Sequence, residues 1–357
     1  MNNDRIDNIL ELMEEASLDY FLISDPESIA YCTNYLNYPY ERMYVFMISK
    51  HGDHKLFCND LFYIDEDLDV DIVWHKDGDD AIQTIVDHMA FPNRIGIDKN
   101  WPSRFLLALM KKLPKAKFIN ASPCVDLVRM KKDLHEQVLM IEASRINDLA
   151  MQDVIDLCKE GLSEKEIAQK LPAIYIKYGA DGNSFEPMIA FGKNGADPHH
   201  SNDNSHVKEC DSIIIDMGCI YKGYCSDMTR TVFFGGITEK QIEVYELVKK
   251  ANETAEKMIK PGVKLCDIDK CARDIINEGG YGKYFNHRLG HFIGRDVHEY
   301  GDVSASFDIK VEEGMIFSIE PGIYLPNEFG VRIEDLVLVT KDGCQVLNSY
   351  SKDIQII

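Results

Sequence analysis

The stretch SIIIDMGCIYKGYCSDMTRT, residues 212–231, decides how the second half of the chain folds. Its β-branched run SIIID and the run 224–234 are typical of two strands, and Lys222-Gly223 supplies turn chemistry between them. Each strand carries an aspartate, Asp216 or Asp227. Buried charge is costly unless it is paired or bound to a metal. The stretch therefore predicts a tight β-hairpin that directs two carboxylates at one point, which we interpret as a pair of metal ions.

Three later stretches place an acid or an imidazole in or beside an apolar, strand-like run. They are HRLGHFIGRDVHE (287–299), SIEPGIY (318–324) and VRIEDLVLV (331–339). Taken singly, each has an ordinary explanation, because a glutamate at a strand end is usually solvated and a histidine after glycine is often a core residue. Together with the two aspartates they form one candidate ligand set: Asp216, Asp227, His291, Glu320 and Glu334.

The composition of this set favours a catalytic metal centre. Four carboxylates buried together without cations would repel one another and become protonated. Oxygen-rich ligation with one imidazole suits Mn, Co, Fe or Zn in a catalytic site better than a structural zinc, which prefers thiolates. Four carboxylates also exceed what one catalytic ion needs, so two ions with shared carboxylates are expected.

Bulk properties exclude several classes of protein. The chain has 357 residues, long enough for two domains, and a formal net charge of −21, which argues against nucleic acid as a partner. No apolar run approaches the roughly 20 residues of a membrane span, and the acidic, amphipathic start does not resemble a signal peptide. Ten scattered cysteines without CxxC spacing are expected to be reduced thiols. We expect a cytoplasmic enzyme.

The chain order predicts an α/β domain at residues 1–125 and an α+β catalytic domain at residues 126–357. Strand-like and helix-like runs alternate in the first 120 residues, and a junction is expected near 122–132. Capping-box motifs at Ser163–Glu166 and Thr238–Gln241 predict helix starts. Two helices followed by strands, twice over, suggest an internal duplication with a cleft between the halves.

The motifs IDMG, SDMTRT, GHFIG, IEPGIY and VRIED, in this order and spacing, resemble the pita-bread metallopeptidases. The resemblance covers essentially the whole chain. It is to the branch of Xaa-Pro dipeptidases (prolidases) and Xaa-Pro aminopeptidases, because methionine aminopeptidases usually lack the amino-terminal domain. It implies a creatinase-like α/β amino-terminal domain, a pita-bread catalytic domain and a homodimer. It also implies two divalent metal ions per subunit, with Mn favoured and Co, Zn or Fe as alternatives.

The resemblance also implies roles for single residues. Asp216 would bind one metal and His291 with Glu320 the other, while Asp227 and Glu334 would bridge. Glu320 would also accept and pass on a proton from a water between the metals. Further roles would fall to residues around the metals: His199 and His298 at the scissile bond, His287 near the substrate proline, and Arg332 behind a ligand carboxylate.

One departure from the family pattern bears on the substrate. Prolidases and their relatives often have a proline shortly after the histidine–glutamate pair, and HEYGDVSAS at residues 298–306 has none. The motifs therefore support the hydrolase reading more strongly than the proline preference. The first reading is an Xaa-Pro dipeptidase acting on small peptides with proline in second position. The alternatives are an Xaa-Pro aminopeptidase acting on longer peptides, a related amide hydrolase, and a non-catalytic binding protein of the same fold.

Overall fold

A computed structural model of the protein describes all 357 residues, which form two compact units, Met1–Arg129 and Met130–Ile357. None of its helices combines the length and the apolar character needed to cross a membrane. All ten cysteines are free thiols, as their spacing predicts. That the units are separately folding domains divided at residue 125 stays a prediction.

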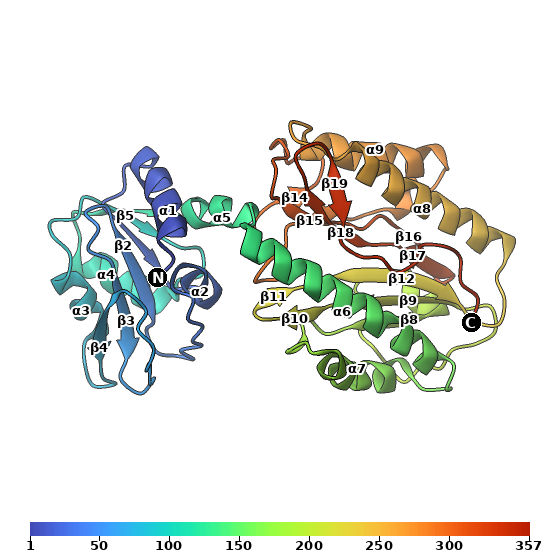
Figure 1. Cartoon of the computed structure of the whole chain (residues 1–357), viewed down its shortest axis with the longest axis horizontal. Helices are drawn as coiled ribbons and strands as arrows, with labels where there is room; N and C mark the ends of the chain where they lie inside the picture. The colour runs from blue at the N-terminus through green and yellow to red at the C-terminus, as the bar shows by residue number, and fades with distance from the viewer. The chain divides into compact units, whose positions relative to one another are not determined.

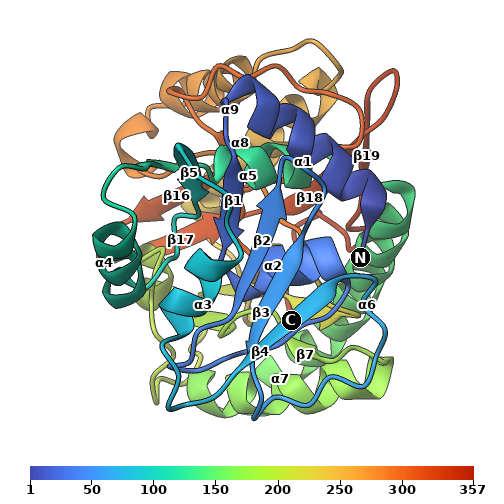
Figure 2. The same ribbon diagram turned by 90° about the vertical axis from the view of Figure 1, so that its left-hand side faces the viewer.

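The first unit is a sheet covered by helices on both faces (Figure 2). Phe21, Phe46 and other side chains of one face pack with α1, α2 and α5, whereas Leu22, Met47 and others of the opposite face pack with α3 and α4. Strands buried on both faces read as nearly continuous apolar runs. In the order β4-β3-β2-β1-β5-β6, the strands are Asp71–His75, Lys55–Asn59, Val45–Ser49, Tyr20–Ile23, Arg94–Ile97 and Lys117–Asn120. The helices are α1 (Asn3–Glu15), α2 (Pro26–Thr33), α3 (Ala81–Asp87), α4 (Ser103–Lys112) and α5 (Pro123–Met130).

The second unit holds two pairs of helices with strands between them (Figure 1). The pairs are α6 (Leu134–Cys158) with α7 (Glu164–Tyr178), and α8 (Glu239–Met258) with α9 (Leu265–Glu278). Both predicted capping boxes are present at the starts of α7 and α8, and a third, Asp133 with Glu136, opens α6. The boundary between the two units, after Arg129, lies inside the expected junction at 122–132. This junction is largely helical, because α5 begins at Pro123, a residue that a first helical turn tolerates.

The strands of the second unit form several small sheets. One has the order β12-β9-β8, a second β15-β18-β19, and a third β11-β10-β7, while β13 pairs with β14 and β16 with β17. Their bounds are β7 Gly182–Asn183, β8 Met188–Phe191, β9 Ser212–Met217, β10 Cys219–Tyr221, β11 Tyr224–Cys225, β12 Met228–Phe233, β13 Gly290–His291, β14 Asp302–Val303, β15 Ile316–Ile319, β16 Gly322–Leu325, β17 Phe329–Arg332, β18 Asp335–Val339 and β19 Cys344–Val346. Two short 3-10 helices, η1 (Gly192–Ala196) and η2 (Gly282–Tyr284), complete the unit.

The predicted hairpin is present, but it consists of two hairpins, one enclosed by the other. Strands β9 and β12 pair antiparallel, with Asp216 opposite Thr229. Between them β10 and β11 form a smaller hairpin in another sheet. Its turn is Lys222-Gly223, where both residues have positive φ, as a two-residue hairpin turn requires. The chain changes sheet at Gly218, where any Cβ would lie 2.1 Å from the carbonyl oxygen of Ser226.

Candidate metal centre

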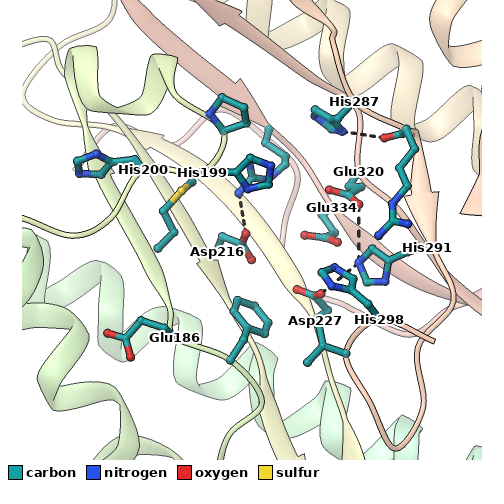
Figure 3. A pocket seen from close by; sticks show the side chains of 16 residues that line it. Glu186, His199, His200, Asp216, Asp227, His287, His291, His298, Glu320 and Glu334 are labelled. Carbon is teal, nitrogen blue, oxygen red and sulfur yellow. Dashed lines mark hydrogen bonds and ion pairs between the residues drawn. The ribbon is translucent and has the colours of Figure 1, made fainter. Parts of the chain in front are cut away.

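The residues predicted from the sequence as ligands, catalytic groups and their supports all line one pocket of the second unit (Figure 3). Its volume is about 650 Å³, within the range of small-molecule sites. The pocket is lined by the five candidate ligands, the three further histidines and Arg332, together with Phe185, Glu186, Met188, Pro198, His200, Arg288 and Val297.

Strand ends bring the five candidate ligands together. Asp216 lies in β9, Asp227 directly precedes β12, and His291 ends β13. Glu320 follows β15, and Glu334 stands in the two-residue gap between β17 and β18. The pairing of β9 with β12 and of β15 with β18 carries these side chains to one space, as Figure 3 shows.

The five side chains lie at two levels of burial. Asp227, His291 and Glu334 are buried, and one ligand atom from each lies within 4.8 Å of the others. The side chains of Asp216 and Glu320 retain 20% and 16% of their exposure, so they face the open side of the pocket. A cation entering the pocket would therefore meet these two carboxylates first.

Charge in this cluster is poorly compensated by the protein. Burial raises the pKa of Asp227 and of Glu334 well above the usual range, and the neighbouring carboxylates raise both further. Burial also raises the pKa of Glu320, to about 7. Carboxylates held this close either bind protons or share cations.

The imidazole of His291 presents a lone pair to the carboxylates. Its Nδ1 lies 3.1 Å from the carbonyl oxygen of Phe292, which can only accept, so Nδ1 carries the hydrogen. Burial lowers the pKa of His291 to about 3, so the ring is neutral and Nε2 is unprotonated. This Nε2 lies 3.6 Å from Asp227 Oδ2 and 3.7 Å from Glu320 Oε1. Three acceptors facing one another fit a shared cation.

Two buried oxygens in the cluster support the same conclusion. Oδ1 of Asp216 and Oδ1 of Asp227 have no hydrogen-bond partner. Buried polar atoms without a partner are rare in folded proteins and often mark an ion. The donor set of four carboxylates and one neutral imidazole, with these unpartnered oxygens, fits divalent transition-metal ions.

Arg332 organises the side of the centre near Asp216. Its Nη2 donates to Asp216 Oδ2 at 2.6 Å, and its Nη1 donates to the hydroxyl of Tyr324 at 2.9 Å. The Tyr324 hydroxyl lies 3.0 Å from Nε2 of His287, whose Nδ1 is 2.7 Å from the carbonyl oxygen of Arg288. That carbonyl fixes the hydrogen on Nδ1, so Nε2 accepts from Tyr324. Burial lowers the pKa of His287 to about 3, and the ring is neutral.

Threonine and arginine side chains hold Glu334. The Thr229 hydroxyl donates to Glu334 Oε2 at 2.7 Å and accepts from Arg332 Nε at 3.1 Å. Behind the pocket, Arg230 Nη1 donates to the main-chain oxygen of Glu334 at 2.7 Å. Side chain and backbone of Glu334 are thus fixed from opposite sides, as outer-shell partners fix the ligands of metal sites.

The remaining predicted histidines lie beside the carboxylates. His298 packs its ring edge-to-face on His291 with centroids 4.2 Å apart, and burial lowers its pKa. His199 is exposed at the rim of the pocket, and its backbone N–H donates to Asp197 Oδ1 at 3.0 Å. Figure 3 shows the His199 ring above Asp216.

Sequence reasoning missed two residues of the centre, Thr229 and Tyr324. A signal existed for Thr229, which is two positions after Asp227 and therefore on the same strand face. Tyr324 gave no such signal, because its contacts with His287 and Arg332 depend on the pairing of β16 with β17.

The comparisons with known proteins agree with this geometry. Residues 138–341 match the model of metallopeptidase family M24, and residues 5–131 match that of the creatinase/prolidase N-terminal domain. An uncharacterized peptidase of Staphylococcus aureus (strain MW2) is 35% identical over 98% of this chain and 99% of its own length.

Solved structures give the same fold. A dipeptidase from Pyrococcus horikoshii OT3 is similar with a TM-score of 0.93 and 34% identity, covering 99% of this chain and all of that one. An Xaa-Pro dipeptidase from Bacillus anthracis has a TM-score of 0.92 and 30% identity, with 99% of each chain covered. These matches confirm the predicted creatinase-like domain and pita-bread catalytic domain. The chain belongs to metallopeptidase family M24 and is a peptidase of that family.

Proposed function

We propose that the chain is a dinuclear-metal Xaa-Pro dipeptidase. The observation that carries this proposal is that four carboxylates and one neutral imidazole line a single pocket of about 650 Å³. When bound, two divalent ions would polarise the scissile carbonyl and acidify a water. Their proposed ligands are Asp216, Asp227, His291, Glu320 and Glu334, with Mn as the favoured metal.

The chain's own residues supply proton transfer and orientation. Glu320 is the group proposed to accept a proton from the attacking water and to pass it to the leaving nitrogen. His298 and His199 are the groups proposed to contact the scissile region. Arg332 keeps Asp216 in place through the 2.6 Å hydrogen bond. Both nitrogens of His287 are engaged, so a substrate proline would meet the face or the C–H edge of this ring.

A guanidinium in the pocket supports a dipeptide over a longer substrate. Arg332 is committed to Asp216, Thr229 and Tyr324. Arg288 lines the same pocket, keeps 35% of its side-chain exposure and pairs with the partly exposed Asp302. An exposed guanidinium of this kind suits the free carboxylate at the end of a dipeptide. We propose that Arg288 makes this contact with the substrate carboxylate. We also propose that the working state of the enzyme is a cytoplasmic homodimer.

The test is hydrolysis of Ala-Pro, Ala-Pro-amide and Ala-Pro-Ala by the metal-depleted protein after addition of Mn²⁺ or Co²⁺, with bound metal counted by elemental analysis. We expect about two ions per subunit and the fastest hydrolysis of Ala-Pro. Arg288→Ala should reduce the preference of the enzyme for Ala-Pro over its amide. Equal or faster cleavage of Ala-Pro-Ala would replace the dipeptidase by an aminopeptidase. Cleavage of none of the three peptides would overturn the Xaa-Pro assignment.

A further inference from the structure

A second cluster of acids and imidazole lies next to the pocket, around Glu164. This glutamate opens helix α7, and its side chain is fully buried. One ligand atom from each of Glu164, His200 and Asp203 lies within 4.8 Å of the others. The composition of the cluster resembles that of a metal site. Whether the Glu164 carboxylate has a free position for a metal ion depends on its hydrogen bonds.

Every lone pair of the Glu164 carboxylate has a donor. Oε1 accepts from the backbone N–H of Phe191 at 2.8 Å and from Asn194 Nδ2 at 2.9 Å. Oε2 accepts from His200 Nε2 at 2.7 Å and from the backbone N–H of Asp203 at 3.1 Å. A carboxylate offers about four acceptor positions, so none is left for an ion. Glu164 is a hydrogen-bond centre rather than a metal ligand.

All four donors belong to one segment, residues 191–203, which carries His199 into the pocket. Further hydrogen bonds fix the end of this segment: Asn202 Oδ1 accepts from the N–H of Ile189 at 2.8 Å, and Lys165 N–H donates to the carbonyl of Asp203 at 3.1 Å. On its other side η1 packs on β17, where any Cβ at Gly330 would lie 1.8 Å from the carbonyl oxygen of Gly195. The segment is held from two sides.

Neighbouring histidines of this segment point in opposite directions. Figure 3 shows His199 above Asp216, whereas His200 turns away from the carboxylates. The ring of His200 contacts Glu164, and the backbone N–H of His200 donates to the carbonyl of Asp197. The side chain of the same aspartate accepts from the backbone N–H of His199. The direction of His200 therefore sets the direction of His199.

We propose that Glu164 is a positioning residue that holds His199 over the metal centre through His200 and the backbone of residues 191–203. The catalytic part of this inference rests on the proposed function. A misplacement of about 1 Å at a reacting group can cost about 100-fold in rate. Loss of the Glu164 contacts should therefore lower kcat without removing a group that touches substrate or metal.

The main test compares Glu164→Gln with Glu166→Gln. The control removes one charge from the same helical turn, where Glu166 is exposed and bonds only within the capping box of Ser163. For Glu164→Gln we expect kcat on Ala-Pro to fall by about 10- to 100-fold, while KM and Mn²⁺ affinity by calorimetry stay within about twofold. Glu166→Gln should match the wild type.

A double-mutant cycle with His199→Ala tests whether Glu164 affects kcat through His199. If Glu164 acts through His199, Glu164→Gln should lower kcat by less than twofold in the His199→Ala background. A full 10-fold or larger loss in that background would overturn the proposal. So would unchanged kcat in a folded Glu164→Gln protein.

Hydrogen–deuterium exchange provides a readout that needs no substrate. Peptides covering residues 190–205 should exchange faster in Glu164→Gln than in wild type or Glu166→Gln, because the amide keeps only one acceptor oxygen and the N–H of either Phe191 or Asp203 then faces an NH₂ group instead. Unchanged exchange would overturn the positioning role even if no Xaa-Pro peptide is cleaved. If Glu164→Gln does not fold, His200→Gln, which keeps an N–H donor, should retain more activity than His200→Ala. Equal activity of those two variants would contradict the proposal.

Discussion

Glu334 and Asp335 are adjacent in the sequence and both are buried, yet their carboxylates lie in opposite electrostatic environments. Glu334 faces the pocket, where burial and neighbouring acids raise its pKa well above the usual range. Asp335 faces away from it. Burial also acts to raise the pKa of Asp335, but Arg230 and Lys352 outweigh it and lower that pKa.

The difference lies in where the compensating cations come from. Arg230 Nη2 donates to Asp335 Oδ1 at 2.7 Å, and Lys352 Nζ lies 2.7 Å from Oδ2 as an ion pair rather than a well-directed hydrogen bond. The protein supplies both partners of Asp335 itself. On the pocket side Arg332 is the buried cation, and it contacts Asp216 rather than Glu334. A carboxylate paired with the protein's own cations holds the fold, and one without such a cation is available to a metal.

The largest expected effect is on activity, from Glu334→Gln. The neutral amide keeps the shape of the side chain but is a poor metal ligand. We expect a loss of kcat/KM larger than the about 10- to 100-fold typical of outer-shell changes. Bound metal, measured by elemental analysis, should fall as well. The metal-free variant should melt no lower than metal-free wild type, because one repelling charge is gone. A variant that keeps full metal content and activity would contradict the pocket role of Glu334.

Asp335→Asn, one residue later, should have the opposite character. It leaves Arg230 buried without its carboxylate, which costs about 3–5 kcal/mol in comparable buried pairs. Lys352 keeps its other partner, Glu256. Thermal unfolding should therefore begin about 5–10 °C lower, with or without Mn²⁺. Calorimetry in both conditions measures this. An unchanged melting temperature would remove the contrast between the two residues.

Arg332→Lys sharpens the contrast, because it keeps the charge and removes the geometry. Arg332 donates in three directions, to Asp216, Tyr324 and Thr229, and a lysine ammonium on a flexible stem does not reproduce that fork. We expect Mn²⁺ affinity or kcat/KM to fall by about 10- to 100-fold. Titration calorimetry measures the Mn²⁺ affinity, and steady-state kinetics measure kcat/KM. Wild-type values in both would show that charge alone suffices.

The smallest expected effect is a dependence of stability on pH. Unfolded glutamate is ionised above pH 5, whereas Glu320 in the metal-free fold has a pKa of about 7. The folded state then binds more protons than the unfolded state, so stability falls as pH rises through 7. The buried neutral histidines His287 and His291 contribute with the opposite sign, so the effect of Glu320 is measured against metal-free Glu320→Gln. Between pH 6 and 8 the melting temperature of the metal-free protein should fall by about 2–3 °C relative to that variant. Saturating Mn²⁺ should remove this difference, and a relative rise with pH would contradict the sign.

Much of the fold followed from the sequence, because the deciding patterns were local. Apolar runs with turn residues located the strands of the first unit, and the capping boxes at Ser163 and Thr238 located two helices. The prediction was wrong where local signals were weak. The strand-like run at 287–299 contains only the two-residue strand β13, Gly290–His291, in a glycine-containing segment.

In the candidate site, too, local sequence patterns identified some residues, whereas residues that depend on long-range contacts were missed. Acids and histidines inside apolar runs identified the residues that the structure brings into one pocket, because that context is chemically unusual. The supports of the site were less visible. Tyr324 and Glu164 contact residues that are distant in sequence, and no local pattern shows that these segments meet. The roles of the ligands and histidines stay predictions until the variants are measured.

The Arg230 contacts have a consequence for the making of the protein. Arg230 donates to the carbonyl of Tyr350, Lys352 completes the Asp335 pair, and Ile356 forms a bridge with Phe233 at the end of β12. A ribosome adds these residues after all others that shape the metal centre. Until residues 350–357 leave the exit tunnel, the backbone of Glu334 lacks its final support. A chain shortened to end at residue 349 should therefore lose these contacts and, with them, enzyme activity.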